Sequence, residues 1–200
     1  AMARASRTAG VKHVIWSTLE DTRKWVPLDD ARLPTLQGKY KVPHFDGKGA
    51  VDHVFAEQAP TTYLLASFYW ENFLYFGMGP RKAHNGDLVL ALPLGGVKLP
   101  GIATEDIGKC AHGLFGRGTS TVGQRFGIAG EVLSGPEMAA AMGRALGRKV
   151  RFEDVPFDVY RGLGFPGADD LGNMFQFQAI LGDEFLRSRD PKLSRSLNPQ

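Results

Sequence analysis

Two apolar runs on either side of an amphipathic segment constrain the fold of this chain more than any other feature. Val11–Ser17 and Thr61–Phe68 are rich in β-branched and aromatic residues, which is typical of strands buried on both faces. Between them, the stretch from His44 to about Gln58 carries apolar residues at helical spacing. The order strand, helix, strand predicts a right-handed crossover between parallel strands of a doubly wound α/β sheet.

The first ten residues fit the same scheme. Residues 1–9 have a composition compatible with a helix, and Gly10 is a suitable stop before the strand at Val11–Ser17. A helix that leads directly into a buried strand is the second half of a βαβ unit. We therefore expect an amino-terminally truncated part of a larger α/β domain, in which the first strands of the sheet are missing.

The rest of the chain alternates loops, helices and short strands. Segment 18–43 is a long connection with several prolines, placed after the carboxyl end of a strand, where α/β folds bind ligands. Caps and periodicity predict helices from Thr104 to about Phe115, from Ser134 to Leu146, over 157–163 and over 170–181, and strands over 88–92, 99–102, 123–129 and 148–154. The polar, basic tail from Arg187 onward is predicted to be a solvated end.

Composition limits the classes of protein to consider. The hydrophobic content of 43% is ordinary for a globular chain, and a net charge of +3 is too small to argue for direct nucleic-acid binding. Cys110 is the single cysteine, which favours a reducing, intracellular setting over a disulfide framework. No apolar run approaches membrane-spanning length, and the five histidines and Cys110 show no recognised metal spacing. We expect neither a membrane segment nor a metal site.

Several motifs, taken together and in order, resemble those of a known family. They are Val11–Ser17 (VKHVIWS), Pro43–Gly49 (PHFDGKG), Tyr69–Phe73 (YWENF), Leu99–Gly108 (LPGIATEDIG) and Leu163–Phe175 (LGFPGADDLGNMF). With this set the chain is similar to the NmrA-like family, a branch of atypical short-chain dehydrogenase/reductases that bind NADP(H). One type within this family acts as an NADPH sensor. The resemblance covers nearly all 200 residues.

The resemblance implies the carboxyl-terminal part of a Rossmann-like doubly wound parallel sheet with a smaller mixed α/β lobe. Residues 1–81 would be the second half of a Rossmann-like NAD(P)-binding domain. Residues 82–200 would supply the remaining Rossmann helix and a substrate or interaction lobe. The Gly-rich fingerprint that binds the pyrophosphate lies upstream in the family, and this chain lacks it.

The resemblance also implies a set of site residues. Lys48 matches the family lysine that reaches the cofactor near the nicotinamide ribose, and Ser17 stands where the wider superfamily keeps its active-site serine. The loop that covers the nicotinamide end corresponds to Tyr69, Trp70, Glu71 and Asn72. Other roles are open for some of them: Ser17 as the end of a strand, Glu71 and Asn72 as helix caps, and Trp70 as a packing residue.

His44 occupies the position of the superfamily's proton-donating tyrosine, four residues before Lys48. An imidazolium could donate a proton, but the amino-terminal end of a helix disfavours its charge. The family's sensor members share this histidine. The resemblance thus favours an NADP(H)-dependent regulator, with NAD(H) as an open alternative cofactor, and with a protein partner or a second copy as the reader of its state.

Two other functions remain open at this point. One is an NAD(P)H-dependent reductase of a small carbonyl or quinone-like substrate, with His44, Lys48 and Ser17 as catalytic residues. The other is an interaction module that has lost its cofactor. The expected location is the cytoplasm, with the nucleus as a second compartment for a regulator.

Overall fold

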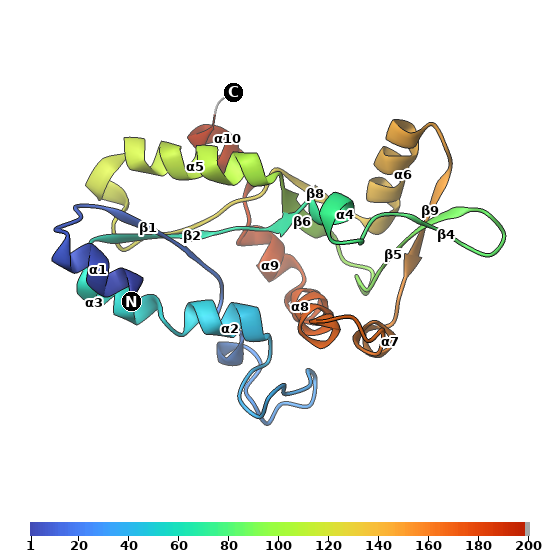
Figure 1. Ribbon diagram of the computed structural model, residues 1–200, viewed down its shortest axis with the longest axis horizontal. Coiled ribbons are helices and arrows are strands. Elements are labelled where there is room, and N and C mark those ends of the chain that lie inside the picture. Colours follow the sequence, from blue (N-terminus) through green and yellow to red (C-terminus); the bar gives the residue numbers. More distant parts are fainter. Residues whose placement is uncertain (199–200) are drawn as a thin grey trace.

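A computed structural model describes residues 1–198 and shows a mixed α/β architecture (Figure 1). Its first sheet has the order β1 (Val14–Thr18), β2 (Thr61–Leu65), β7 (Arg125–Gly127), and both pairings are parallel. The predicted parallel crossover from the first strand to the second is confirmed. The other edge of β1 pairs with no strand in residues 1–198.

Helices cover both faces of this sheet. Figure 1 shows α5 (Thr104–Gly116) along one face and α1 (Met2–Thr8), α2 (Pro43–Gly49) and α3 (Asp52–Gln58) along the other. The buried side chains of α5, Cys110 and Leu114, join an apolar cluster with Leu64 of β2. Two covered faces explain why β2 reads as an apolar run, since all five of its residues are buried.

The remaining elements form the right half of Figure 1 and the carboxyl-terminal end. A second sheet has the order β3 (Phe68–Tyr69), β6 (Leu99–Ile102), β8 (Glu131–Leu133), and a third has the order β4 (Arg81–Lys82), β5 (Leu88–Leu92), β9 (Val150–Asp154). The helices of this part are α4 (Asn72–Tyr75), α6 (Gly135–Leu146), α7 (Phe157–Arg161), α8 (Ala168–Leu181), α9 (Asp183–Arg187) and α10 (Pro191–Leu197). Two 3-10 turns belong to the connections of the first sheet: Thr22–Lys24 follows β1, and Gly118–Thr121 follows α5. Ser134 caps α6 with a complete capping box, as its position predicts.

The single helix predicted from His44 to Gln58 is wrong in one respect, because it is two helices. The chain leaves helical geometry at Val51, whose φ and ψ are −103° and 3°. Two glycines in α2, Gly47 and Gly49, lower the helix propensity of this stretch. Tertiary contact then decides the break, because Gly49 lies against the backbone of residues 20–21.

Segment 18–43 is a packed excursion of the chain. Val26 and Leu33 are buried in the main apolar cluster. Lys41 is only 1% exposed, and its ammonium donates hydrogen bonds to the carbonyls of Asp30 (2.7 Å) and Leu33 (2.6 Å). These contacts fix the middle of the segment to the main apolar cluster and join Lys41, near its end, to the segment's own backbone.

The prediction of a solvated tail from Arg187 is wrong. Arg189 is 1% exposed, and its guanidinium forms a two-pronged ion pair with Glu20, at 2.8 and 2.9 Å. Its Nε also donates to the carbonyl of Ala66. After this anchor, α10 packs against α5 and buries Leu197.

Candidate functional site

A cavity of about 140 Å³ lies at the carboxyl end of β1, between α2 and α8. Its lining comes from Ser17–Leu19 at the end of β1, from Ala66–Tyr69 after β2, and from side chains of α2, α8 and α9. The carboxyl edge of a parallel sheet is where open α/β folds bind ligands. The cavity therefore occupies the position that the topology predicts for a site.

Two local features hold α2 beside this cavity. The fully buried Asp46 carboxylate accepts hydrogen bonds from the Thr22 N–H (2.7 Å), the Thr22 hydroxyl (2.6 Å) and the Lys41 N–H (2.8 Å). At the other end of α2, a Cβ on Gly49 would lie 2.5 Å from the backbone nitrogen of Asp21. The absence of a side chain at Gly49 lets the helix approach the end of β1.

Lys48 projects from α2 and lines the cavity. Burial lowers the pKa of its ammonium below the ordinary lysine value. Within residues 1–198 its side chain makes no ion pair and no hydrogen bond. An unpaired, partly desolvated cation beside Ser17 is suited to an anionic or hydroxyl-bearing ligand.

His44 lines the same cavity and lies at the border between α2 and α8. Its Nδ1 is 2.8 Å from Oδ1 of Asp170 in the first turn of α8. The two groups are within ion-pair distance, yet Oδ1 is enclosed and makes no hydrogen bond of acceptable geometry. The Asp170 carboxylate therefore faces the Nδ1 edge of the imidazole from the start of α8.

The four residues expected to cover the nicotinamide end divide into two pairs. Tyr69 and Asn72 line the cavity. Trp70 is a packing residue: its ring stacks on Phe73 and covers Gly101, where any side chain would overlap it. Glu71 makes no cap for its own helix; its carboxylate accepts hydrogen bonds from the Thr104 N–H, at 3.0 and 3.1 Å, at the start of α5.

Sequence reasoning missed the contribution of α8. Leu171, Met174 and Gln178 line the cavity, and Asp170 faces His44. The spacing of three and four residues puts Leu171, Met174 and Gln178 on one face of a helix. A glutamine within an otherwise apolar helical stripe was the one signal in the sequence that could have pointed to this wall.

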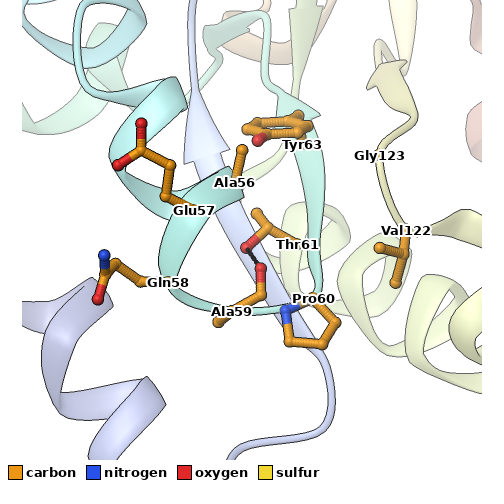
Figure 2. A pocket seen from close by; sticks show the side chains of 9 residues that line it. All are labelled: Ala56, Glu57, Gln58, Ala59, Pro60, Thr61, Tyr63, Val122 and Gly123. Atoms are coloured by element: carbon orange, nitrogen blue, oxygen red, sulfur yellow. Dashed lines mark hydrogen bonds between the residues drawn. The ribbon is translucent and has the colours of Figure 1, made fainter.

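Two larger cavities are less suited to bind a polar ligand. One of about 480 Å³, drawn in Figure 2, lies at the amino end of β2 and is lined by residues 56–61, Tyr63, Val122 and Gly123. In Figure 2 the Thr61 hydroxyl donates a hydrogen bond to the Ala59 carbonyl, so its O–H group is not free to bind a ligand. The other, of about 640 Å³, is lined by several charged residues, among which Glu20 pairs with Arg189 and Asp52 with Arg125. Neither matches the unpaired groups of the 140 Å³ cavity.

Two sequence expectations concern absences. Across residues 1–198, no group of three or more His, Cys, Asp or Glu side chains is arranged to hold a metal ion. In the same part of the chain, no helix has the length and apolar character needed to cross a membrane.

The parallel sheet with helices on both faces and a lysine-lined cavity at its carboxyl edge defines a Rossmann-type α/β protein. The model of the NmrA-like family matches residues 1–185. The chain belongs to the NmrA-like family, as the sequence motifs indicate.

Solved structures of similar fold include a regulator and two reductases. NmrA, a negative transcriptional regulator solved with NADP, has a TM-score of 0.74 at 22% identity; 99% of this chain and 64% of that one are covered. The Citrobacter sp. triphenylmethane reductase, complexed with NADP(H), has a TM-score of 0.72 at 15% identity, covering 100% and 65%. An NADPH-dependent quinone oxidoreductase (QOR2) from Escherichia coli has a TM-score of 0.66 at 18% identity, covering 98% and 65%. The chain thus spans 64 to 65% of the length of these structures.

Proposed function

We propose that this protein binds NADP(H) at the cavity between α2 and α8 and acts as a redox-responsive regulator, with NAD(H) as a weaker alternative cofactor. The observation that carries the proposal is the unpaired Lys48 ammonium beside Ser17 at the carboxyl end of β1. Similar structures solved with NADP, NAD and NADP(H) support this choice of cofactor.

The residues present fit the nicotinamide end of such a cofactor. The Lys48 ammonium would donate hydrogen bonds to ribose hydroxyls, and Tyr69, at the end of β3, and Asn72, at the start of α4, would contact the nicotinamide. When bound, the nicotinamide supplies or accepts a hydride. Of the residues expected there, Trp70 and Glu71 would act indirectly, by packing and by anchoring α5.

The way the cavity is assembled supports a regulatory role. One wall is α2, which belongs to residues 1–81, and another is α8, which belongs to residues 82–200, the two domains that we propose. A ligand that contacts both walls changes the free energy of their relative arrangement, and a protein partner or a second copy could read that change. The proposed compartment is the cytoplasm, with access to the nucleus.

The cofactor proposal is tested by isothermal titration calorimetry with NADPH. Lys48→Ala should weaken binding by about 1–3 kcal/mol, the range for loss of a hydrogen bond to a charged group. Lys48→Arg should restore only part of it, because a planar fork does not replace a compact ammonium. The exposed Lys12, changed to Ala, is the matched control. Equal affinity in wild type and Lys48→Ala would remove Lys48 from the site.

The regulatory part is tested by limited proteolysis of segment 18–43 with and without NADPH. We expect the cleavage rate in this segment to change on NADPH binding, and Lys48→Ala to lose the change. Equal cleavage rates without NADPH and at saturating NADPH would argue against a conformational change in segment 18–43 as the readout.

The His44–Asp170 contact favours a second function, an NAD(P)H-dependent reductase of a small carbonyl or quinone-like substrate. A reductase must protonate the oxygen on which negative charge develops as the hydride arrives, and with Lys48 assigned to the cofactor a second side chain is needed as the proton donor. His44 could donate from Nε2, which has no partner in residues 1–198, while Asp170 faces Nδ1.

An NADPH-consumption screen with aldehydes, ketones and quinones separates the two functions. The regulator proposal expects little turnover by wild type and a gain, at most, in His44→Tyr. Rapid turnover by wild type that His44→Ala abolishes would favour the reductase and make His44 its proton donor.

A further inference from the structure

A short apolar tip projects from the connection between β3 and β4. It consists of Leu74, Tyr75 and Phe76, which follow one another at the end of α4 and expose between 75% and 77% of their surfaces. Single exposed apolar residues are common on proteins, whereas a patch of several large ones is typical of an interaction site. The base of the tip is fixed, because Phe73 and Met78 pack against the main apolar cluster on either side of it.

The backbone of the apolar tip suits surroundings without water. The N–H groups of Leu74 and Tyr75 both donate to the Glu71 carbonyl at 2.9 Å, and the N–H of Phe76 donates to the Asn72 carbonyl at 3.2 Å. A backbone N–H group without a partner is costly in hydrocarbon. Because these three are bonded within the chain, the tip can leave water without losing their hydrogen bonds.

Cations gather at one end of the third sheet. The strand register places Arg81 of β4 and Arg151 of β9 on either side of Val89, with Lys82 one row nearer the end of the sheet. The last turn of α6 and the connection from α6 to β9 add three more cations at this end. We call the six exposed side chains the basic cluster: Arg81, Lys82, Arg144, Arg148, Lys149 and Arg151.

Few acids balance the basic cluster. The strands of the third sheet and the β4–β5 hairpin contain three acidic residues, Asp87, Glu153 and Asp154. Asp154 accepts hydrogen bonds from the N–H groups of residues 94–96. Asp87 lies 3.7 Å from Nε of Arg151, and the other five cations make no ion pair within residues 1–198. The cluster is therefore strongly positive, in a chain where 24 cations and 21 acids nearly balance.

We propose that the apolar tip and the basic cluster together dock this protein on a membrane surface that contains anionic phospholipids. Arg81 connects the two parts, because its guanidinium donates a hydrogen bond to the carbonyl of Gly77 (2.8 Å), directly after Phe76. A small apolar anchor alone binds a bilayer weakly and reversibly, and a neighbouring polybasic patch makes the binding stable. The tip enters the headgroup layer while the cations stay at the level of the phosphates.

The form of the apolar tip favours a bilayer over a nucleic acid. Single-stranded nucleic acids offer flat bases that stack on aromatic rings, which leaves no role for Leu74. A bilayer interface takes up leucine and phenylalanine side chains and holds the ring of a tyrosine at headgroup level. A fluid bilayer can also close around a projecting tip.

The test is sedimentation of the chain with vesicles, in the absence of NADPH. One set of vesicles is pure phosphatidylcholine, and the other is an equal mixture of phosphatidylcholine and phosphatidylserine. We expect the chain to bind the mixed vesicles and not the neutral ones. Added salt should weaken the binding, because it screens the attraction between the basic cluster and the anionic lipid.

Two variants remove the two parts of the surface separately. Phe76→Ser should weaken binding to the mixed vesicles by about tenfold, the effect of withdrawing one large apolar side chain. The double variant Arg148→Gln/Lys149→Gln should weaken it by about 25-fold, because each cation near an anionic bilayer contributes about fivefold. Both variants should keep the melting temperature of wild type, since all three side chains are exposed.

Matched controls make the same changes in α1, which lies at the opposite end of the molecule from the third sheet (Figure 1). Met2→Ser removes an exposed apolar side chain, and Arg4→Gln/Arg7→Gln removes two exposed cations. The second control lowers the net charge as much as Arg148→Gln/Lys149→Gln does. Both controls should bind the mixed vesicles as wild type does.

A third variant, Phe76→Trp, reports insertion directly. Its fluorescence should shift to shorter wavelength with the mixed vesicles and should be quenched by brominated lipid. Wild type supplies the background from Trp16, Trp25 and Trp70. An unshifted and unquenched signal in Phe76→Trp would overturn the insertion of the tip.

Other results would also overturn the inference. They are a failure of wild type to bind the mixed vesicles, and equal weakening in the α1 controls and in the variants of the tip and the cluster. Binding of an RNA or DNA oligonucleotide without binding of vesicles would assign the surface to nucleic acid. A wild-type dimer that Phe76→Ser converts to a monomer in sedimentation velocity would assign the tip to a second copy of the chain.

Discussion

Gly49 and Gly47, two residues apart in α2, should respond with opposite signs to the same substitution. A Cβ on Gly49 would lie 2.5 Å from the backbone nitrogen of Asp21 and 2.9 Å from the carbonyl carbon of Glu20. These are backbone atoms, which cannot turn aside as the end of a side chain can. A Cβ on Gly47 would meet nothing within 4 Å.

The expected magnitudes follow from these contacts. Gly47→Ala should stabilise the protein by about 0.5–1 kcal/mol, because alanine loses less backbone entropy in a helix. Gly49→Ala gains less of that benefit at the last helical position, and overpacking costs about 1–3 kcal/mol. Gly49→Ala should therefore destabilise the protein, and the difference between the two variants should reach about 2–3 kcal/mol.

Urea unfolding followed by circular dichroism measures both variants under identical conditions. A difference of this size corresponds to melting temperatures about 4–12 °C apart for a chain of this length. Because Gly49 sets the approach of α2 to β1, Gly49→Ala should also weaken NADPH binding through displacement of Lys48. If both variants gained stability equally, the close approach of α2 to residues 20–21 would be refuted.

Two further perturbations test buried charge. Arg189→Met leaves the Glu20 carboxylate buried without its partner and should lower the free energy of unfolding by about 3–5 kcal/mol. Arg187→Met, at an exposed position, is the control and should lower it by less than about 0.5 kcal/mol. A double-mutant cycle with Glu20→Gln that shows no coupling would contradict the ion pair. Burial lowers the pKa of Lys48, so its protonated form destabilises the folded state at pH 7. This penalty fades as the pH rises from the pKa of the folded state to that of the unfolded chain, about 10.4. In urea titrations, Lys48→Met should therefore have a larger free energy of unfolding than wild type at pH 7, and the difference should disappear above about pH 10. A difference independent of pH would show that Lys48 is not desolvated.

Local patterns were sufficient for much of the framework. The run at Thr61–Phe68 identified the central strand because it is rich in the β-branched and aromatic residues that fill a strand buried on both faces. Ser134 marked the start of α6, since a cap is a contact between residues three apart. The family motifs located Ser17, His44 and Lys48, and the structure brings these three together in one cavity.

Contacts between distant segments decided the rest. No local signal marks Arg189 as buried, since its partner Glu20 lies 169 residues away, and a basic tail reads the same whether or not a carboxylate faces it. The break between α2 and α3 follows from the approach of Gly49 to residues 20–21, which only the packed chain reveals. The wall of α8 joins the site because helix packing sets Asp170 against His44 and turns Gln178 toward the end of β1. Periodicity identifies one face of a helix, but the element that this face meets depends on the whole fold.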